Sequence, residues 1–129
     1  MILVDNSQSN LVVSPNDYGA NKTKSPAALN VHVGAVDNGC VILLNGDTNS
    51  SLHLSDLYVN VVNGGHQGTI GDYYGSGFKP TPSTPTVVWQ TNESTTMGLA
   101  FSLNFEIRNI RSYSAGNYST NLFFTVVPQ

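Results

Sequence analysis

The sequence predicts an all-β protein built as a two-layer antiparallel sandwich, and two observations lead to this prediction. Apolar and polar side chains alternate in many short runs, as in strands with one buried face, and no segment shows the 3.6-residue period of an amphipathic helix. Turn signals rich in Gly, Asn and Asp separate these runs. Because 129 residues is the size of one domain, we expect a single sandwich over residues 1–129.

Composition narrows the possible partners. Charged residues make up 10% of the chain, and its formal charge is −3 with five Lys and Arg residues, which argues against nucleic acid as a partner. No apolar run is long enough for a membrane-spanning helix, so we expect no membrane insertion. The single cysteine, Cys40, has no partner for an internal disulfide and is expected to be a small buried side chain. The first residues show no signal-peptide pattern, which leaves open a non-exported protein or a mature form.

Roughly seven or eight short strands are expected in order along the chain. The first six are short apolar runs at residues 2–4, 11–14, 29–35, 40–45, 52–62 and 86–91. The run at 40–45, CVILLN, is continuous and suits a buried strand. The turns Asp37-Asn38-Gly39 and Asn45-Gly46-Asp47 bound it.

The last two strands carry the strongest signal. Residues 99–108 alternate strictly, which predicts a half-buried strand. After a turn at residues 114–117 the final run alternates more loosely, and Phe123 and Val127 are apolar on its second face. We therefore expect the final strand to be covered on both faces. Its inner neighbour is either the strand at 99–107 or a more distant one.

A long Gly-, Tyr- and Pro-rich loop is expected at residues 63–86, and loops of this length are often functional. Aromatic rings among Gly and Ser are typical of adaptable recognition loops. His66, Tyr73, Tyr74 and Phe78 are therefore a candidate ligand loop. The alternative is that these rings pack against the sandwich.

The sequence contains no constellation that points to catalysis. His32, His53 and His66 lack the spacing of metal ligands. No nucleophile elbow, phosphate-binding loop or dinucleotide fingerprint is present, and most of the acidic residues lie in turns. We expect no catalytic residue, no metal site and no cofactor, and hence a protein that is not an enzyme.

At LAFSLNFEIRNI…SYSAGNYSTNLFFTVVPQ, within residues 99–129, the chain resembles the C-terminal part of chaperone–usher fimbrial (pilin) subunits. In that family an alternating strand, an AG-x-Y turn and a second alternating strand follow one another, and Ala115, Gly116 and Tyr118 occupy the turn positions here. The resemblance implies an incomplete immunoglobulin-like sandwich with a hydrophobic groove beside its final strand. A periplasmic chaperone, and then the N-terminal segment of another subunit, would fill that groove by strand addition.

The resemblance implies a structural or adhesive subunit of a surface fimbria, located extracellularly at the cell surface. Its partners would be other fimbrial subunits, the chaperone, and a host glycan or protein receptor. The implied residues of the donor-strand groove are Leu99, Phe101, Leu103, Phe105, Tyr118, Leu122, Phe124 and Val126. Two other functions stay open: a phage or viral virion protein, as a decoration or fibre domain, and a carbohydrate-binding module that uses Tyr73, Tyr74 and Trp89.

Overall fold

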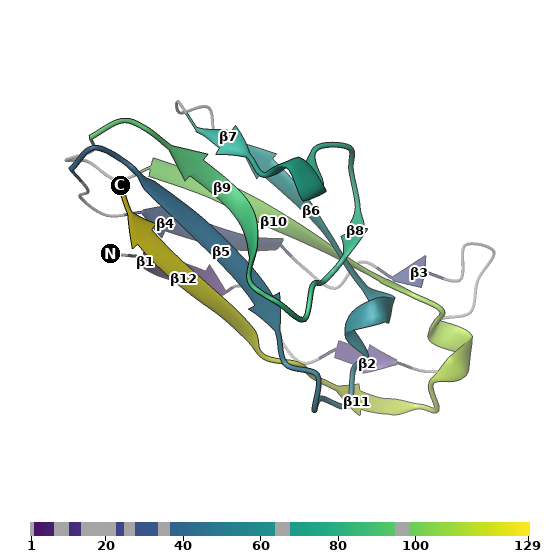
Figure 1. Cartoon of the computed structure of the whole chain (residues 1–129). Helices are drawn as coiled ribbons and strands as arrows, with labels where there is room; N and C mark the ends of the chain where they lie inside the picture. The colour runs from purple at the N-terminus through teal and green to yellow at the C-terminus, as the bar shows by residue number, and fades with distance from the viewer. Residues whose placement is uncertain are drawn as a thin grey trace.

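A computed structural model describes residues 2–6, 11–13, 23–24, 28–33, 37–63, 68–94 and 99–129. Most of their strands form two antiparallel sheets that face each other, with three short 3₁₀ turns and no α-helix among the described residues (Figure 1). The predicted all-β antiparallel sandwich is confirmed. Within these residues, no helix is long and apolar enough to span a bilayer.

The first sheet has β10 at its centre, between β4 and β6. In spatial order it contains β1 (Ile2–Asn6), β4 (Ala28–Val33), β10 (Leu99–Arg108), β6 (Leu57–Asn63) and β8 (Lys79–Pro80). The two-residue strand β3 (Thr23–Lys24) pairs with the end of β10 at Ile107 and Arg108. All the pairings are antiparallel.

The second sheet is smaller and has β12 at one edge. In spatial order it contains β12 (Leu122–Pro128), β5 (Cys40–Gly46), β9 (Thr86–Thr91) and β7 (Thr69–Ile70). A separate ribbon joins β2 (Leu11–Val13) to β11 (Gly116–Tyr118), which directly precedes β12. The 3₁₀ turns are η2 (Leu54–Asp56), η3 (Asp72–Tyr74) and η4 (Ile110–Ser112).

Alternation along the central strands produces the core. In β10, Phe101, Leu103, Phe105 and Ile107 point inward and are buried, as the sequence predicted. In β5, Cys40, Ile42 and Leu44 are buried while the residues between them are partly exposed, so this apolar run has one buried face and not two.

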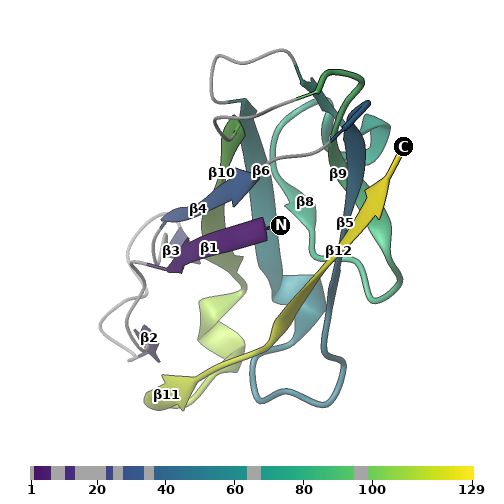
Figure 2. The ribbon, with the colours of Figure 1, turned by 90° about the vertical axis from the view of Figure 1, so that its left-hand side faces the viewer.

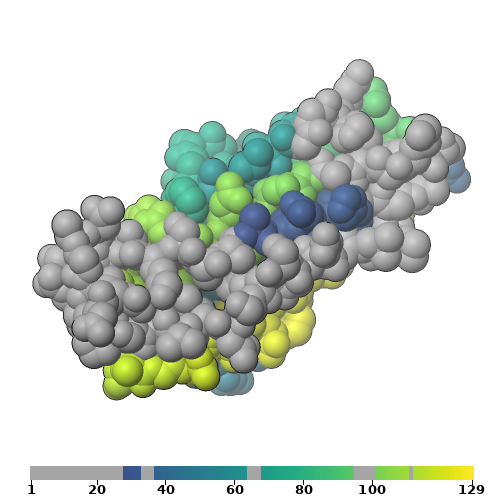
Figure 3. Space-filling model, turned by 180° about the vertical axis from the view of Figure 1, so that it is seen from behind, coloured from purple at the N-terminus to yellow at the C-terminus, as the bar shows by residue number. Residues whose placement is uncertain are grey.

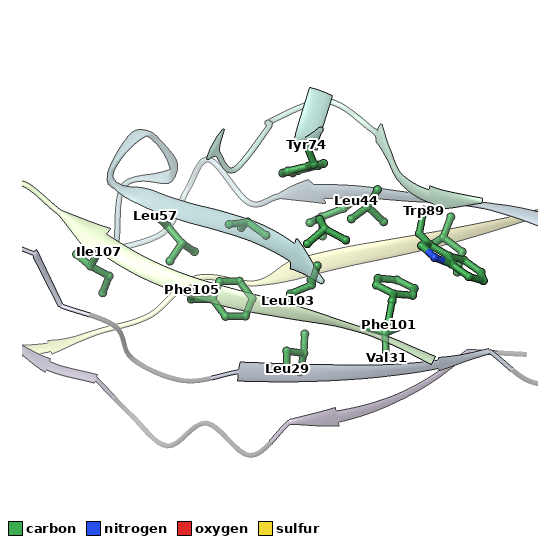
Figure 4. Packing of buried hydrophobic residues seen from close by; sticks show 14 of the residues in the cluster. Leu29, Val31, Leu44, Leu57, Tyr74, Trp89, Phe101, Leu103, Phe105 and Ile107 are labelled. Atoms are coloured by element: carbon green, nitrogen blue, oxygen red, sulfur yellow. The ribbon is translucent and has the colours of Figure 1, made fainter. Parts of the chain in front are cut away.

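An aromatic pair joins the two sheets across the core. Trp89 of β9 and Phe101 of β10 are stacked, with ring centroids 5.3 Å apart and an interplanar angle of 15° (Figure 4). Both side chains are almost fully buried. Stacked rings of this size bury large apolar areas, so the pair is a principal contact between the layers.

The order of six of the strands corresponds to that of an immunoglobulin-type sandwich. In such domains the sheets have the orders A-B-E-D and G-F-C. The order β1-β4-β10-β6 corresponds to A-B-E-D, and β12-β5 corresponds to F-C. The other strands of the two sheets have no counterpart in this order. β9 lies beside β5 on the side away from β12 but follows β6 in the chain, and the two-residue strands β3, β7 and β8 are additional.

A hydrogen bond at the corner between β10 and β12 supports the same assignment. The hydroxyl of Tyr118 donates to the carbonyl oxygen of Ser114 over 2.7 Å. Immunoglobulin-type domains have such a tyrosine corner, in which a Tyr near the start of strand F bonds to the backbone a few residues upstream. The turn before it begins at Asn109, whose φ of 61° lies in the left-handed region that Asn tolerates.

The segment expected as a loop at residues 63–86 is more ordered than predicted. It contains β7, η3 and β8. β7 pairs with β9 of the second sheet, and β8 pairs with β6 of the first. The segment therefore passes between the two sheets on the side of the sandwich opposite β1 and β12 (Figure 1).

Candidate functional site

The final strand lies at the edge of its sheet. β12 pairs with β5 along its whole length, from Leu122 opposite Gly46 to Pro128 opposite Cys40. Of the two neighbours that the sequence left open, it is therefore the more distant strand that pairs with β12, and not β10. Among the described residues no strand pairs with β12 on its other side, which we call the open edge.

Apolar side chains cover both faces of β12. Leu122, Phe124 and Val126 are half-buried and pack against the core. On the other face Phe123 is 49% exposed and Val127 is 44% exposed. Residues 122–128 contain no charged side chain. Edge strands usually carry charges or bulges that prevent pairing with another chain, and here Pro128 at the end is the one such device in the strand.

The open edge occupies a defined position in the immunoglobulin order. In a complete domain a seventh strand, G, pairs with the outer side of strand F, which is β12 here. The N-terminal strands flank this position without filling it, because β1 pairs with β4 in the first sheet and β2 pairs with β11 ahead of β12. Figure 2 looks onto this side of the sandwich, where β1 borders one sheet and β12 the other.

The predicted groove residues do not all lie beside the open edge, because some are in β10 of the first sheet and others are in β12 or at the corner before it. Phe101, Leu103 and Phe105 lie in the middle of the first sheet, where β4 stands between β10 and the edge strand β1. They form part of the core against which Leu122, Phe124 and Val126 pack. Tyr118 also packs against the core from the corner. The backbone of Leu99 pairs with Val33, and its side chain lies outside the described part.

The predicted ligand loop does not form one exposed surface. Tyr73 is 38% exposed, and its hydroxyl donates to the carbonyl oxygen of Pro80 over 2.7 Å. Its ring meets that of Tyr74 edge to face, with centroids 4.8 Å apart. Tyr74 itself is buried in the core, Phe78 is half-buried, and His66 lies outside the described residues. Of the described members, Tyr73 is the one that solvent reaches most readily.

Burial changes the proposed roles of two aromatic residues. Tyr74 and Trp89 are 1% and 0% exposed, so neither ring can present a face to a sugar in this structure. The hydroxyl of Tyr74 has no hydrogen-bond partner among the described residues. Burial, and to a lesser extent the neighbouring Tyr73, raises the pKa of Tyr74. Packing therefore accounts for Tyr74 and Trp89.

A group that the sequence did not single out lies on the outer face of the first sheet. The guanidinium carbon of Arg108 lies 3.9 Å from the centroid of the Tyr58 ring. Its Nε lies 3.2 Å from Oε1 of Glu106 on the same strand. The alternation of residues 99–108 indicates that Glu106 and Arg108 share the polar face of one strand. Nothing in the sequence identified Tyr58 as their neighbour on the adjacent strand.

Two further titratable side chains, those of Tyr113 and Cys40, have structural environments. Tyr113 donates to Oδ2 of Asp56 over 2.8 Å and accepts from the backbone N–H of His53 over 3.1 Å. The Cys40 thiol is buried, and burial raises its pKa. Within the described part of the chain, no cluster of three or more His, Cys, Asp or Glu side chains is arranged to hold a metal ion.

Comparisons of the chain with models of protein families, with curated proteins and with solved structures found no match. A functional assignment therefore depends on two structural features: the open edge of β12, and the immunoglobulin strand order with its tyrosine corner.

Proposed function

We propose that the chain is a structural subunit of a surface fimbria and that a strand from another subunit pairs with the open edge of β12. The observation that carries this proposal is that β12, an uncharged and apolar strand in the position of strand F, has no described partner on the side where strand G would lie. In strand addition, backbone hydrogen bonds supply affinity and alternate side chains fill pockets. β12 offers both its unpaired backbone groups and its half-buried side chains.

The side chains of β12 favour an apolar partner strand. An incoming strand would cover part of Phe123 and Val127 on one face and of Leu122, Phe124 and Val126 on the other. Burying the exposed parts of Phe123 and Val127 would contribute up to about 1–3 kcal/mol together. Ordering the partner strand opposes this gain, so the backbone ladder must supply the rest of the affinity.

The experiment adds a peptide of residues 1–13, MILVDNSQSNLVV, to the purified chain as a stand-in for another subunit's N-terminal strand. The melting temperature should rise with peptide concentration, because the peptide binds the folded state. Backbone amides of residues 122–128 that face the open edge should gain protection from hydrogen exchange. A scrambled peptide of the same composition is the control. If millimolar peptide changes neither quantity, strand addition at this edge is excluded.

A virion protein is the second candidate, and one feature of the topology favours it. From β4 through β5, β6, β9 and β10 to β12, successive major strands alternate between the two sheets. Jelly rolls of viral capsid and lectin domains pass between their sheets in a similar way. This support is an analogy of fold, which does not by itself imply function. A secretory leader encoded directly upstream would favour the fimbrial role, and recovery of the chain in purified virions would favour this one.

A further inference from the structure

The outer face of the first sheet carries a polar patch that has no role in the proposed assembly. Alternation along β6 and β10 directs Tyr58, Asn60, Asn104, Glu106 and Arg108 to this face, and we call these five residues the Arg108 patch. Glu106 lies opposite Tyr58 and Asn104 lies opposite Asn60 in the register of the two strands. Figure 3 shows this face of the molecule, where β4, β10 and β6 lie side by side.

Arg108 is held in one orientation by two contacts. Its guanidinium stacks on the Tyr58 ring, and its Nε binds the Glu106 carboxylate. Its side chain is nevertheless 42% exposed, and its two terminal nitrogens make no hydrogen bond or ion pair with the described residues. A guanidinium fork that is already oriented loses little freedom when it binds a carboxylate through two parallel hydrogen bonds.

Two amide side chains lie in the next row of the same face. Asn60 and Asn104 are half-buried neighbours in adjacent strands, and neither side chain bonds to another described residue. They lie two residues along the strands from the Tyr58–Glu106 row, a rise of about 7 Å. Each amide offers both a donor and an acceptor, which is what a sugar hydroxyl requires. Beyond them, Ser102 donates to Oδ1 of Asn30 over 2.9 Å and continues the polar face.

We propose that the Arg108 patch binds an acidic sugar, a pyranose that carries a carboxylate. The carboxylate pairs with the terminal nitrogens of Arg108, and ring hydroxyls bond to Asn60 and Asn104. The amides distinguish this ligand from a simple carboxylate or an acidic peptide, since neither of those presents a ring of hydroxyls. Glu106 accepts from Nε of Arg108 and so leaves the two terminal nitrogens as donors for the ligand, although the Arg108–Glu106 pair carries no net charge.

The test uses glucuronic acid as the probe, titrated into the full chain and followed by NMR of the backbone and side-chain amides. We expect saturable shifts at Asn60, Asn104 and Arg108. Glucose, which lacks the carboxylate, and acetate, which lacks the ring, should each bind at least about tenfold more weakly, because each loses one of the two sets of hydrogen bonds.

Two variants locate the site. Arg108→Lys keeps the charge and removes the planar fork, so glucuronic acid should bind about tenfold more weakly or not measurably. Lys79→Gln on β8 also changes a cation of the first sheet but lies outside the patch, so affinity should stay within about twofold. Far-ultraviolet circular dichroism and the melting temperature confirm that both variants fold.

Three results would overturn the proposal. If acetate or inorganic sulfate bound as tightly as glucuronic acid, the patch would be a general anion site that does not recognise a sugar ring. A tetraglutamate peptide binding more tightly than the sugar would identify an acidic peptide as the ligand. The absence of saturable shifts at tens of millimolar glucuronic acid would exclude the site. None of these results bears on peptide binding at β12, which lies in the other sheet.

Discussion

The hydroxyl of Tyr118 closes the corner between the sheets by donating to the carbonyl oxygen of Ser114 over 2.7 Å. The Tyr118 ring also meets that of Tyr113 edge to face, with centroids 4.8 Å apart, and so anchors the corner to the core. The chain leaves β10 in the first sheet and enters β12 in the second through this corner. The hydrogen bond therefore helps to fix where the open edge begins.

Replacing this hydroxyl should destabilise the fold by a modest amount. Tyr118→Phe keeps the ring contacts and removes one hydrogen bond, so the free energy of unfolding should fall by about 0.5–1.5 kcal/mol. Urea denaturation measures the change. Tyr58→Phe is the matched control, because the Tyr58 hydroxyl makes no hydrogen bond with the described residues, and it should cost less than about 0.5 kcal/mol. Equal effects of the two variants would mean that the corner bond adds no stability.

Removing the unpartnered hydroxyl of Tyr74 should stabilise the protein. The oxygen is buried without a partner among the described residues, and an unsatisfied buried group costs about 1–3 kcal/mol. Tyr74→Phe leaves the packing intact and should raise the free energy of unfolding by about 1 kcal/mol. The readout is the denaturation midpoint in urea. A loss of stability in Tyr74→Phe would instead indicate that an ordered water pairs with the hydroxyl.

Truncating the two adjacent tyrosines should have unequal effects. Tyr74→Ala empties a buried site and should cost about 3–5 kcal/mol. Tyr73→Ala removes an exposed ring and its bond to Pro80, so it should cost about 1 kcal/mol or less. Thermal unfolding of both variants checks the difference. Comparable losses would show that Tyr73 is as much a part of the core as Tyr74.

Introducing a charge on β12 should suppress association through the open edge. Phe123→Lys replaces an exposed apolar side chain and should leave the free energy of unfolding within about 0.5 kcal/mol. It should weaken binding of the 1–13 peptide at least about tenfold, since an edge lysine opposes strand pairing. Val62→Lys is the control, because Val62 has a similar exposure of 42% but lies in the other sheet, where β6 places it opposite Ser102 of β10. If Phe123→Lys and Val62→Lys bind the peptide equally well, the edge is not the binding surface.

The sequence predicted which faces are buried better than it predicted which strands are neighbours. Alternation in residues 99–108 identified Phe101, Leu103 and Phe105 as inward-facing, and they are buried. The same pattern does not specify the strand alongside, so the pairing of β12 with β5 was one of two possibilities. β7 and β8 contain two residues each, too few to show any period, and they lie within the segment predicted as a loop.

The candidate sites show the same limit of local patterns. Tyr73 and Tyr74 look equivalent in the sequence, but a 3₁₀ turn has three residues per turn and directs consecutive side chains about 120° apart. One ring therefore faces solvent while the next enters the core. Arg108 and Tyr58 meet only because β6 pairs with β10, which is a tertiary relationship. Of this site, sequence alone could place only Glu106 and Arg108 together, because they lie two residues apart on one face of a strand.

Stability should decline in alkaline solution, and Tyr113 should account for part of the decline. Burial, and next the hydrogen bond to Asp56, raises the pKa of Tyr113 to about 12, against about 10 for an unperturbed tyrosine. The unfolded chain therefore loses the Tyr113 proton at lower pH than the folded chain does. Its contribution to stability is complete below pH 10 and is lost as the pH rises from about 10 to about 12.

Urea denaturation at several pH values between 8 and 11 measures this dependence. The free energy of unfolding should be nearly constant up to about pH 9.5 and then fall. Tyr113→Phe should be less stable than the parent at pH 8, because it lacks the bonds to Asp56 and to the backbone of His53, and its stability should fall less steeply above pH 10. If Tyr113→Phe and the parent lose stability equally between pH 10 and 11, ionisation of other groups, including the buried Tyr74, governs alkaline unfolding.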